Sequence, residues 1–149
     1  LLGASWRANA AIPISNDQLS PDPHRQTEQI EMLIDDVFAD FTPEERRMIK
    51  LVADCETGGR AKNGKPNGII LHIKADGGIV TNASSGALGA MQLIPRYHSR
   101  HFREQHRHLD VRQVRDNLVY ARSLMLERKK RGEHFLSDWY PSLRCAGLI

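Results

Sequence analysis

The sequence lacks any long hydrophobic run. No segment approaches the ~18 consecutive apolar residues that a transmembrane helix requires, so we expect no stable insertion into a membrane. It also lacks an internal repeat. Its 40% hydrophobic and 26% charged residues are ordinary for a globular protein, and 149 residues suffice for one domain with its own core.

Several catalytic and ligand-binding motifs are also missing. The sequence has no His-Glu-x-x-His motif, no Cys/His ligand spacing, no Gly-x-Ser-x-Gly nucleophile elbow and no phosphate-binding loop. We therefore predict no metal site and no cofactor. Histidines do cluster among arginines, and this pattern favours a solvent-exposed basic helix. The residues are His98, His101, His106 and His108 with Arg96, Arg100, Arg103 and Arg107.

Aromatic residues are few, at 6%, which bears on the partner of a basic protein. A net charge of +3 and a pI of about 9.1 favour a polyanionic partner, either a bacterial wall or nucleic acid. Acids at positions 104, 110, 116 and 127 interrupt the basic stretch, and few aromatic rings are present to stack on bases. We therefore expect no nucleic-acid partner. A nucleic-acid-binding module is the alternative interpretation of the basic stretch.

Cysteine is scarce, with Cys55 and Cys145 as the two copies. A disulfide between them would close a loop of about 90 residues. Two unrelated buried thiols account for the pair equally well.

The N-terminal residues 1–23 are rich in Pro, Ser, Asn and Asp and show no periodicity. The small residues at its start are typical of a clipped export signal, although an artificial chain boundary also explains them. We interpret residues 1–23 as a flexible leader or the remnant of a targeting segment, and residues 24–149 as the folded domain.

Apolar residues recur at helical spacing over residues 27–38, 42–57 and 110–131. A shorter helix is expected over 97–105. The ends of the longer helices are marked by capping residues and glycines. The helix over 42–57 has Thr42, Pro43 and Glu45 at its start and Gly58 and Gly59 at its end. The helix over 110–131 has Asp110 and Gln113 at its start and Gly132 at its end.

The segment between these helices has a different pattern. β-Branched runs at 69–73 and 79–81 flank Asp76-Gly77-Gly78, a turn signal that predicts a small β-hairpin. The small residues within 84–95 allow the backbone to approach a ligand or another element closely. The predicted fold class is α+β, mostly α-helical.

Glu56 is a candidate catalytic residue, although a glutamate near a helix end is usually just solvated. Cleavage of a glycosidic bond needs a carboxylic acid that is still protonated near neutral pH. A glutamate in the last turn of a half-buried helix, next to glycines and apolar side chains, can have its pKa raised by desolvation. No second acid has an obvious spacing for activating water, although Asp54 and Asp76 are near in sequence.

The motifs after Glu56 follow a recognisable order. A Glu-Thr-Gly element precedes a Gly-Ala-x-Gly-x-Met-Gln-x-x-Pro stretch, a helix with Asp and Asn, a Trp and a terminal Ala-Gly. Over about residues 45–147 the chain resembles the soluble-type (SLT) lytic transglycosylases of the lysozyme-like superfamily, and the Gly-Ala stretch is the specific part of the match. The matching residues are Glu56-Thr57-Gly58, Gly86 to Pro95, Asp110, Asn117, Trp139 and Ala146-Gly147.

The resemblance implies a lysozyme-like domain that cleaves the MurNAc-GlcNAc β-1,4 bond of peptidoglycan strands. In that family the glutamate, here Glu56, protonates the glycosidic oxygen and then acts as base while the 6-hydroxyl of the sugar closes a 1,6-anhydro ring. Met91 and Gln92 are expected to contact the acetamido sugar. If Met91 is instead a core residue, the side chain of Gln92 alone reaches the cleft.

The chain departs from the family pattern at two positions. Family members usually have a serine three residues before the Gly-Ala pair, and this chain has Ala83 at that position. Ser84 or Ser85 is expected to replace the serine. The tyrosine that contacts the catalytic acid in the family is also missing, so Tyr97 or Tyr140 takes its role or the activity is altered.

The resemblance also implies that the C-terminal segment lies beside the catalytic helix. It thereby places Cys145 near Cys55, which favours the disulfide and an oxidising compartment outside the cytosol. We expect an exported monomer. The alternatives are a muramidase that uses water on the same fold, and a catalytically weakened wall-binding module.

Overall fold

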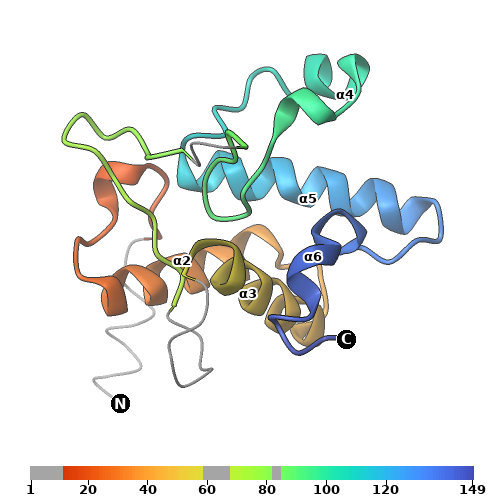
Figure 1. Cartoon of the computed structure of the whole chain (residues 1–149), viewed down its shortest axis with the longest axis horizontal. Helices are drawn as coiled ribbons and strands as arrows, with labels where there is room; N and C mark the ends of the chain where they lie inside the picture. The colour runs from red at the N-terminus through yellow and green to blue at the C-terminus, as the bar shows by residue number, and fades with distance from the viewer. Residues whose placement is uncertain (1–11, 59–67, 82–84) are drawn as a thin grey trace.

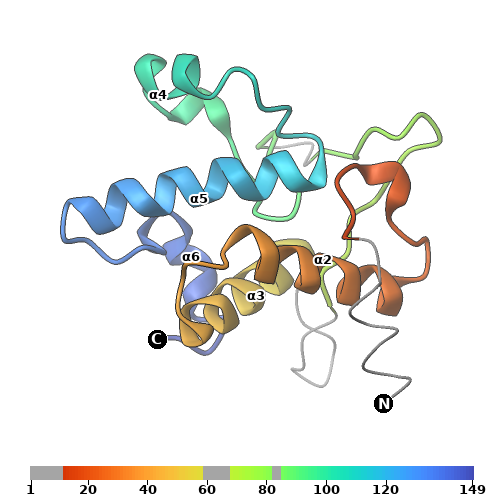
Figure 2. The same cartoon turned by 180° about the vertical axis from the view of Figure 1, so that it is seen from behind.

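The computed structural model describes residues 12–58, 68–81 and 85–149, and this part of the chain is mostly helical (Figures 1 and 2). Among these residues no helix combines the length and the apolar character needed to cross a bilayer. The elements in chain order are η1 (Asn16–Gln18), α2 (Pro23–Val37), α3 (Pro43–Thr57), η2 (Pro95–Tyr97), α4 (Arg100–Gln105), α5 (Val114–Lys130), η3 (Ser137–Trp139) and α6 (Tyr140–Leu143).

Helix α3 begins where the sequence predicts. The Thr42 hydroxyl accepts a hydrogen bond from the backbone N–H of Glu45 (3.1 Å), and the Glu45 carboxylate accepts one from the N–H of Thr42 (2.9 Å). This reciprocal pair satisfies two donors that a helix start leaves open. The helix ends at Gly58 in a right-handed conformation (φ −96°), so the expected left-handed cap is wrong for Gly58. Gly59 lies outside the described residues.

Helix α5 begins at Val114, with its N-cap at Gln113 in place of the predicted Asp110, three residues later. Asp110 does not cap it, because its carboxylate accepts from Arg112 (3.0 Å). The N–H of Val114 instead donates to Oδ1 of Asn16 (3.0 Å), a residue 98 positions earlier. Gly132 ends the helix with φ +75°, as expected for a left-handed glycine cap.

The predicted flexible leader is wrong for residues 12–22. Asn16 is buried, and its Nδ2 donates to the carbonyls of Arg112 (2.7 Å) and Gly77 (3.1 Å). Leu19 belongs to the core, and Asp22 caps α2 by accepting from the N–H of Arg25. Helix α2 accordingly starts four residues before the predicted position. Residues 1–11 lie outside the described part of the chain.

Where a β-hairpin was expected, the described residues form a single antiparallel bridge between Ile73 and Ile79. Gly77 turns the chain with φ +83°, and the N–H of Gly78 donates to Asp76. The N–H of Val80 donates to the carbonyl of His72 (2.9 Å). The two segments therefore lie side by side without forming regular strands.

The core lies between the helices. Helix α2 packs against both α3 and α5, and α6 packs against α3, so the C-terminal segment lies beside the end of α3 (Figures 1 and 2). The largest fully buried side chains among the described residues are apolar, and most of them lie on α2, α3 and α5. They include Ile30, Leu33, Phe38, Ile49, Met91, Leu118 and Met125.

One buried amide holds the loop at 88–93 against this core. Asn117 on α5 accepts from the N–H of Met91 (3.1 Å) and donates to the carbonyls of Leu88 (2.9 Å) and Val111 (2.8 Å). The indole N–H of Trp139 donates to the carbonyl of Met91 (2.8 Å). Both polar groups of the Met91 backbone are thereby satisfied by buried side chains.

A glycine is required where this loop crosses Asn117. Gly89 has φ +73°, and a Cβ at that position would lie 2.3 Å from Nδ2 of Asn117. Since real Cβ contacts are essentially never this short, any other residue would displace the amide. The Gly-x-Met-Gln spacing of the sequence motif thus has a structural cause that is independent of catalysis.

We predict that Asn117→Ala lowers the free energy of unfolding by ~3 kcal/mol, because one buried and two partly buried backbone groups lose their partner. Urea denaturation followed by circular dichroism measures the change. Gln105→Ala, at an exposed position on α4, is the control and should change stability little. Equal stability of Asn117→Ala and the control would contradict the role given to the amide.

Candidate functional site

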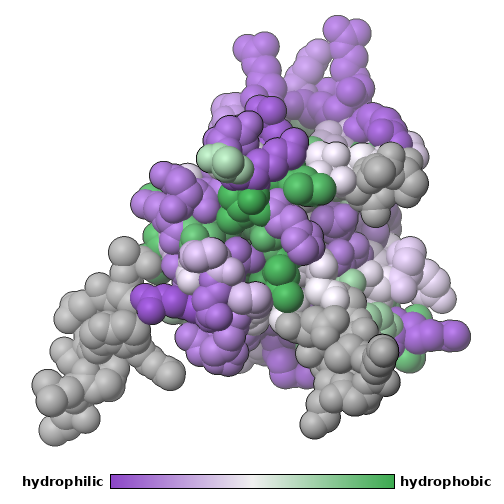
Figure 3. Space-filling view, turned by 60° about the vertical axis from the view of Figure 1, so that its left-hand side comes forward, coloured by the Kyte–Doolittle hydropathy of each residue, from purple (hydrophilic) through white to green (hydrophobic). Residues whose placement is uncertain are grey.

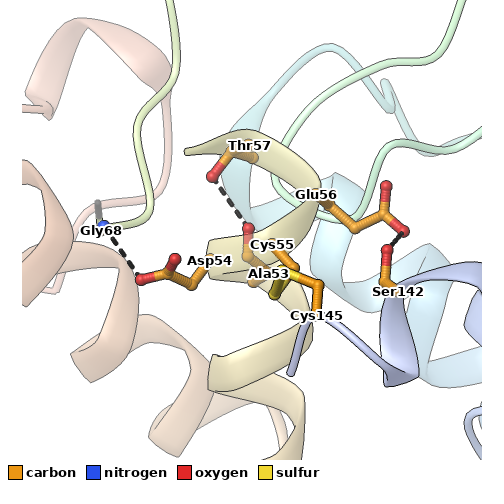
Figure 4. The surroundings of a disulfide bond; sticks show 8 residues. All are labelled: Ala53, Asp54, Cys55, Glu56, Thr57, Gly68, Ser142 and Cys145. Carbon is orange, nitrogen blue, oxygen red and sulfur yellow. Dashed lines mark hydrogen bonds between the residues drawn. A yellow bond between two sulfur atoms is a disulfide. The ribbon is translucent and has the colours of Figure 1, made fainter. Parts of the chain in front are cut away.

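Glu56 lies in the last turn of α3, beside residues that tie this turn to its surroundings (Figure 4). The hydroxyl of Thr57 donates to the carbonyl of Ala53 (2.8 Å) and accepts from the N–H of Ile70 (3.1 Å). The carboxylate of Asp54 accepts from the N–H of Gly68 (2.9 Å). The segment from residue 68 onward is therefore fixed to the same helix end that carries Glu56.

A pocket of about 220 Å³ opens beside Glu56. Three parts of the chain form it: the end of α3, the bridge segments around residues 70–81, and the loop that Asn117 holds. Its lining residues are Glu56, Thr57, Ile70, Leu71, His72, Ile79, Val80, Thr81, Gly89 and Gln92.

Two opposing effects set the pKa of Glu56. Burial raises the pKa above its ordinary value near 4.5, because the ionised carboxylate loses hydration. A hydrogen bond from the hydroxyl of Ser142 to Oε1, 2.5 Å long, favours the ionised form and acts in the opposite direction. Burial is the larger effect, so the carboxyl keeps its proton to higher pH than an exposed glutamate.

Ser142 reaches Glu56 because the C-terminal segment is anchored to α3. Cys55 and Cys145 form a disulfide, with Cα atoms 6.0 Å apart, which is the pairing that the resemblance implied. Cys55 precedes Glu56 in the chain, and Cys145 lies three residues after Ser142. The cross-link therefore joins the two short segments that carry the acid and its hydrogen-bond donor (Figure 4).

Glu56 is the one carboxylate among the described residues that line the pocket. No Asp or Glu occurs in the segments that the structure does not describe, which are residues 1–11, 59–67 and 82–84. Asp54, the nearest acid in sequence, is bonded to the backbone at Gly68. Asp76, the other acid considered from the sequence, is exposed and accepts from the turn at Gly78.

The structure separates the two expected sugar-contacting residues. Met91 is 0% exposed and belongs to the core, so its side chain is not placed to touch a ligand. Gln92 lines the pocket and has φ +47°, a strained conformation for a residue with a side chain. Its Nε2 donates to the carbonyl of Gly89 (2.9 Å). This bond leaves Oε1 as the amide's hydrogen-bond acceptor.

The expected replacements for the family's serine and tyrosine do not line the pocket among the described residues. Ser84 lies outside the described part of the chain. The hydroxyl of Ser85 accepts from the N–H of Ala87 (3.2 Å). Tyr97 is 72% exposed and Tyr140 is 64% exposed, and neither has a hydrogen bond to Glu56 in the described structure.

Sequence reasoning missed Ser142, which supplies the contact with Glu56 that was expected from a tyrosine. Its one signal was a position one helical turn before Cys145. His72 and Thr81 were also missed as pocket residues. Among the described residues, no three His, Cys, Asp or Glu side chains come together as they would around a metal ion.

Comparison of the chain with protein-family models, with curated proteins and with solved structures finds no match. The chemistry of the site is therefore the basis for its proposed function.

We predict that Ser142→Ala raises the pKa of Glu56 further. The substitution removes the hydrogen bond that favours the carboxylate and leaves burial, which favours the neutral acid. Carbon-13 NMR titration of the Glu56 side-chain carboxyl measures the shift. Ser142→Thr keeps a hydroxyl and should restore the titration toward that of the wild type. A pKa that falls in Ser142→Ala would contradict this assignment.

We further predict that Glu56→Gln stabilises the protein at neutral pH. The pKa of Glu56 is higher in the folded than in the unfolded chain, so the wild type loses stability as pH rises from about 4.5 through the folded pKa. A neutral amide side chain at this position carries no such cost. The difference in melting temperature should therefore be small at about pH 4 and favour the variant at about pH 7. An identical difference at both pH values would contradict the raised pKa.

Proposed function

We propose that the protein is a peptidoglycan lytic transglycosylase with a lysozyme-like domain, in which Glu56 is the general acid and base. The observation that carries the proposal is a half-buried glutamate with a raised pKa, which is the one carboxylate lining its pocket among the described residues. A neutral carboxylic acid is what protonation of a glycosidic oxygen requires.

The reaction needs one carboxyl in two successive roles. Glu56 donates its proton to the glycosidic oxygen, and the bond from that oxygen to C1 of the muramic residue breaks. The resulting carboxylate then takes the proton from the 6-hydroxyl of the same sugar, whose oxygen bonds to C1. The products are a 1,6-anhydro muramic end and a free 4-hydroxyl, and the acid is regenerated.

Ser142 supports the second role. Its hydroxyl stays within hydrogen-bond distance of Oε1, so it stabilises the negative charge that appears on Glu56 after the first proton transfer. Oε2 points away from Ser142 and is the oxygen available to the substrate (Figure 4).

A single carboxylate favours the transglycosylase over the muramidase. Hydrolases of the usual two-carboxylate kind need a second group, either to activate water or to form a covalent intermediate. The pocket offers none among its described residues. In the proposed reaction the sugar's own 6-hydroxyl replaces water.

The other pocket residues fit an N-acetylated sugar. Oε1 of Gln92 can accept the N–H of an acetamido group, and the bond from Nε2 to the carbonyl of Gly89 holds the side-chain amide in place. Ile70, Ile79 and Val80 supply an apolar wall for the acetamido methyl group.

The experiment is digestion of purified peptidoglycan, with released muropeptides identified by mass. Wild type should release anhydro-muropeptides, and Glu56→Gln should reduce the rate roughly 10²-fold or more, the usual worth of a general acid. Glu31→Gln is the matched control. Burial also raises the pKa of Glu31, but Glu31 lies on α2 and does not line the pocket. It should therefore leave the rate unchanged.

Products with an added water, lost in Glu56→Gln, would replace the proposal with a muramidase. Equal rates for wild type and Glu56→Gln would show that Glu56 is not the catalytic acid. No release by the wild type would leave a wall-binding module as the better account.

A further inference from the structure

A short segment around α4 carries a net positive charge. Residues 96–108 contain four arginines and one glutamate, a net charge of three. We name this segment, with α4 inside it, the basic face.

The packing of α4 turns the arginines outward. Ser99 caps the helix, and Phe102 is buried against the rings of Tyr120 and His106. Nδ1 of His98 lies 2.8 Å from the hydroxyl of Tyr120, a second link to α5. These contacts fix the orientation of α4.

The side chains on the opposite side of α4 border a hollow of about 360 Å³. Its lining residues are Arg100, Arg103, Glu104 and Arg107. Hydrophilic side chains cover the top of the molecule in Figure 3, at the height where α4 lies in Figure 1.

The arginines of the basic face differ from most others in their pairing. Arg100 pairs with Glu104, whereas Arg96, Arg103 and Arg107 have no ion pair with any described residue. Elsewhere among the described residues, most arginines form an ion pair with a carboxylate of the protein. The paired ones are Arg46, Arg47, Arg112, Arg115, Arg122, Arg128 and Arg131.

An exposed aromatic ring lies at the edge of the basic face. Tyr97 lies three residues before the start of α4, and the guanidinium of Arg96 lies 4.9 Å from its ring centroid. One ring face is thus covered by a cation, while most of the side chain stays open to solvent. A flat ring beside unpaired guanidinium groups suits a ligand that combines a sugar surface with carboxylates.

From these observations we infer that the basic face is a second binding site, separate from the Glu56 pocket, for an anionic glycan. Its ligand is the carboxylate-bearing peptidoglycan strand, so this inference rests on the proposed function. Guanidinium groups bind the carboxylates, and Tyr97 packs against a sugar ring. The site would hold the enzyme on its polymer while the pocket acts on one bond.

Nucleic acid is the less fitting partner. Helix α4 has six residues, too few to lie along a major groove with a row of base-reading side chains, and Tyr97 is the one exposed aromatic residue of the segment.

Sedimentation with purified peptidoglycan sacculi tests the site. Every variant is the full chain with Glu56→Gln, so that the sacculi stay intact during the measurement. The test pair adds Arg103→Glu and Arg107→Glu. The control pair adds Arg25→Glu and Lys130→Glu. All four residues are exposed, and both pairs change the net charge equally. The first pair should weaken binding roughly tenfold at low salt, and the control pair should not. Circular dichroism melting shows that each variant is folded.

Two further probes identify the ligand. Chitin, a neutral polymer of the same N-acetylated sugar, should show no difference between the two pairs. Equal loss from both pairs on sacculi, or loss from neither, would overturn the inference. If the two pairs of variants differ in binding to duplex DNA but not in binding to sacculi, the inference is overturned in favour of a nucleic-acid partner.

The two proposals fail separately. If Glu56→Gln still releases muropeptides, the proposed catalytic role is wrong, and the comparison of the two pairs of variants on sacculi at low temperature still decides the basic face. If the two pairs behave alike while Glu56→Gln is inactive, the second site is wrong and the catalytic proposal stands.

Discussion

The position of the pocket depends on the side-chain amide of Asn117. This one group, buried on α5, bonds to Leu88, Met91 and Val111, while Trp139 bonds to the other side of Met91. Leaving such buried backbone groups without partners is costly, so the loop has one favourable position. That position sends Met91 into the core and Gln92 into the pocket. The amide therefore links the packing of the helices to the shape of the site.

The chemistry of the site rests on a balance at Glu56. Burial alone favours the protonated acid but disfavours the carboxylate that the proposed reaction requires. The hydroxyl of Ser142 stabilises the carboxylate by a hydrogen bond. The acid still keeps a raised pKa, because burial remains the larger influence. The disulfide between Cys55 and Cys145 keeps the two partners together, although they lie 86 residues apart in the chain.

Local features were predictable from the sequence, and features made by distant residues were not. The start of α3 was correct because Thr42 and Glu45 form the cap within one turn. The start of α5 was wrong because Asn16 supplies its cap from 98 residues away, which also explains why the leader is packed. Glu56 was found from its place at a helix end and its motif. Ser142 was missed because its contact depends on tertiary packing. Met91 was expected at the sugar because a motif does not show which of two neighbours faces the core.

In the proposed reaction the substrate, and not water, supplies the attacking oxygen after Glu56 has acted as acid. Digestion of peptidoglycan in water enriched in oxygen-18, followed by mass analysis of the new muramic ends, tests it most directly. We expect anhydro ends without the heavy isotope, formed at the same rate as in ordinary water. Muramic ends that carry one oxygen-18 atom would contradict it, because they would show that water attacks C1.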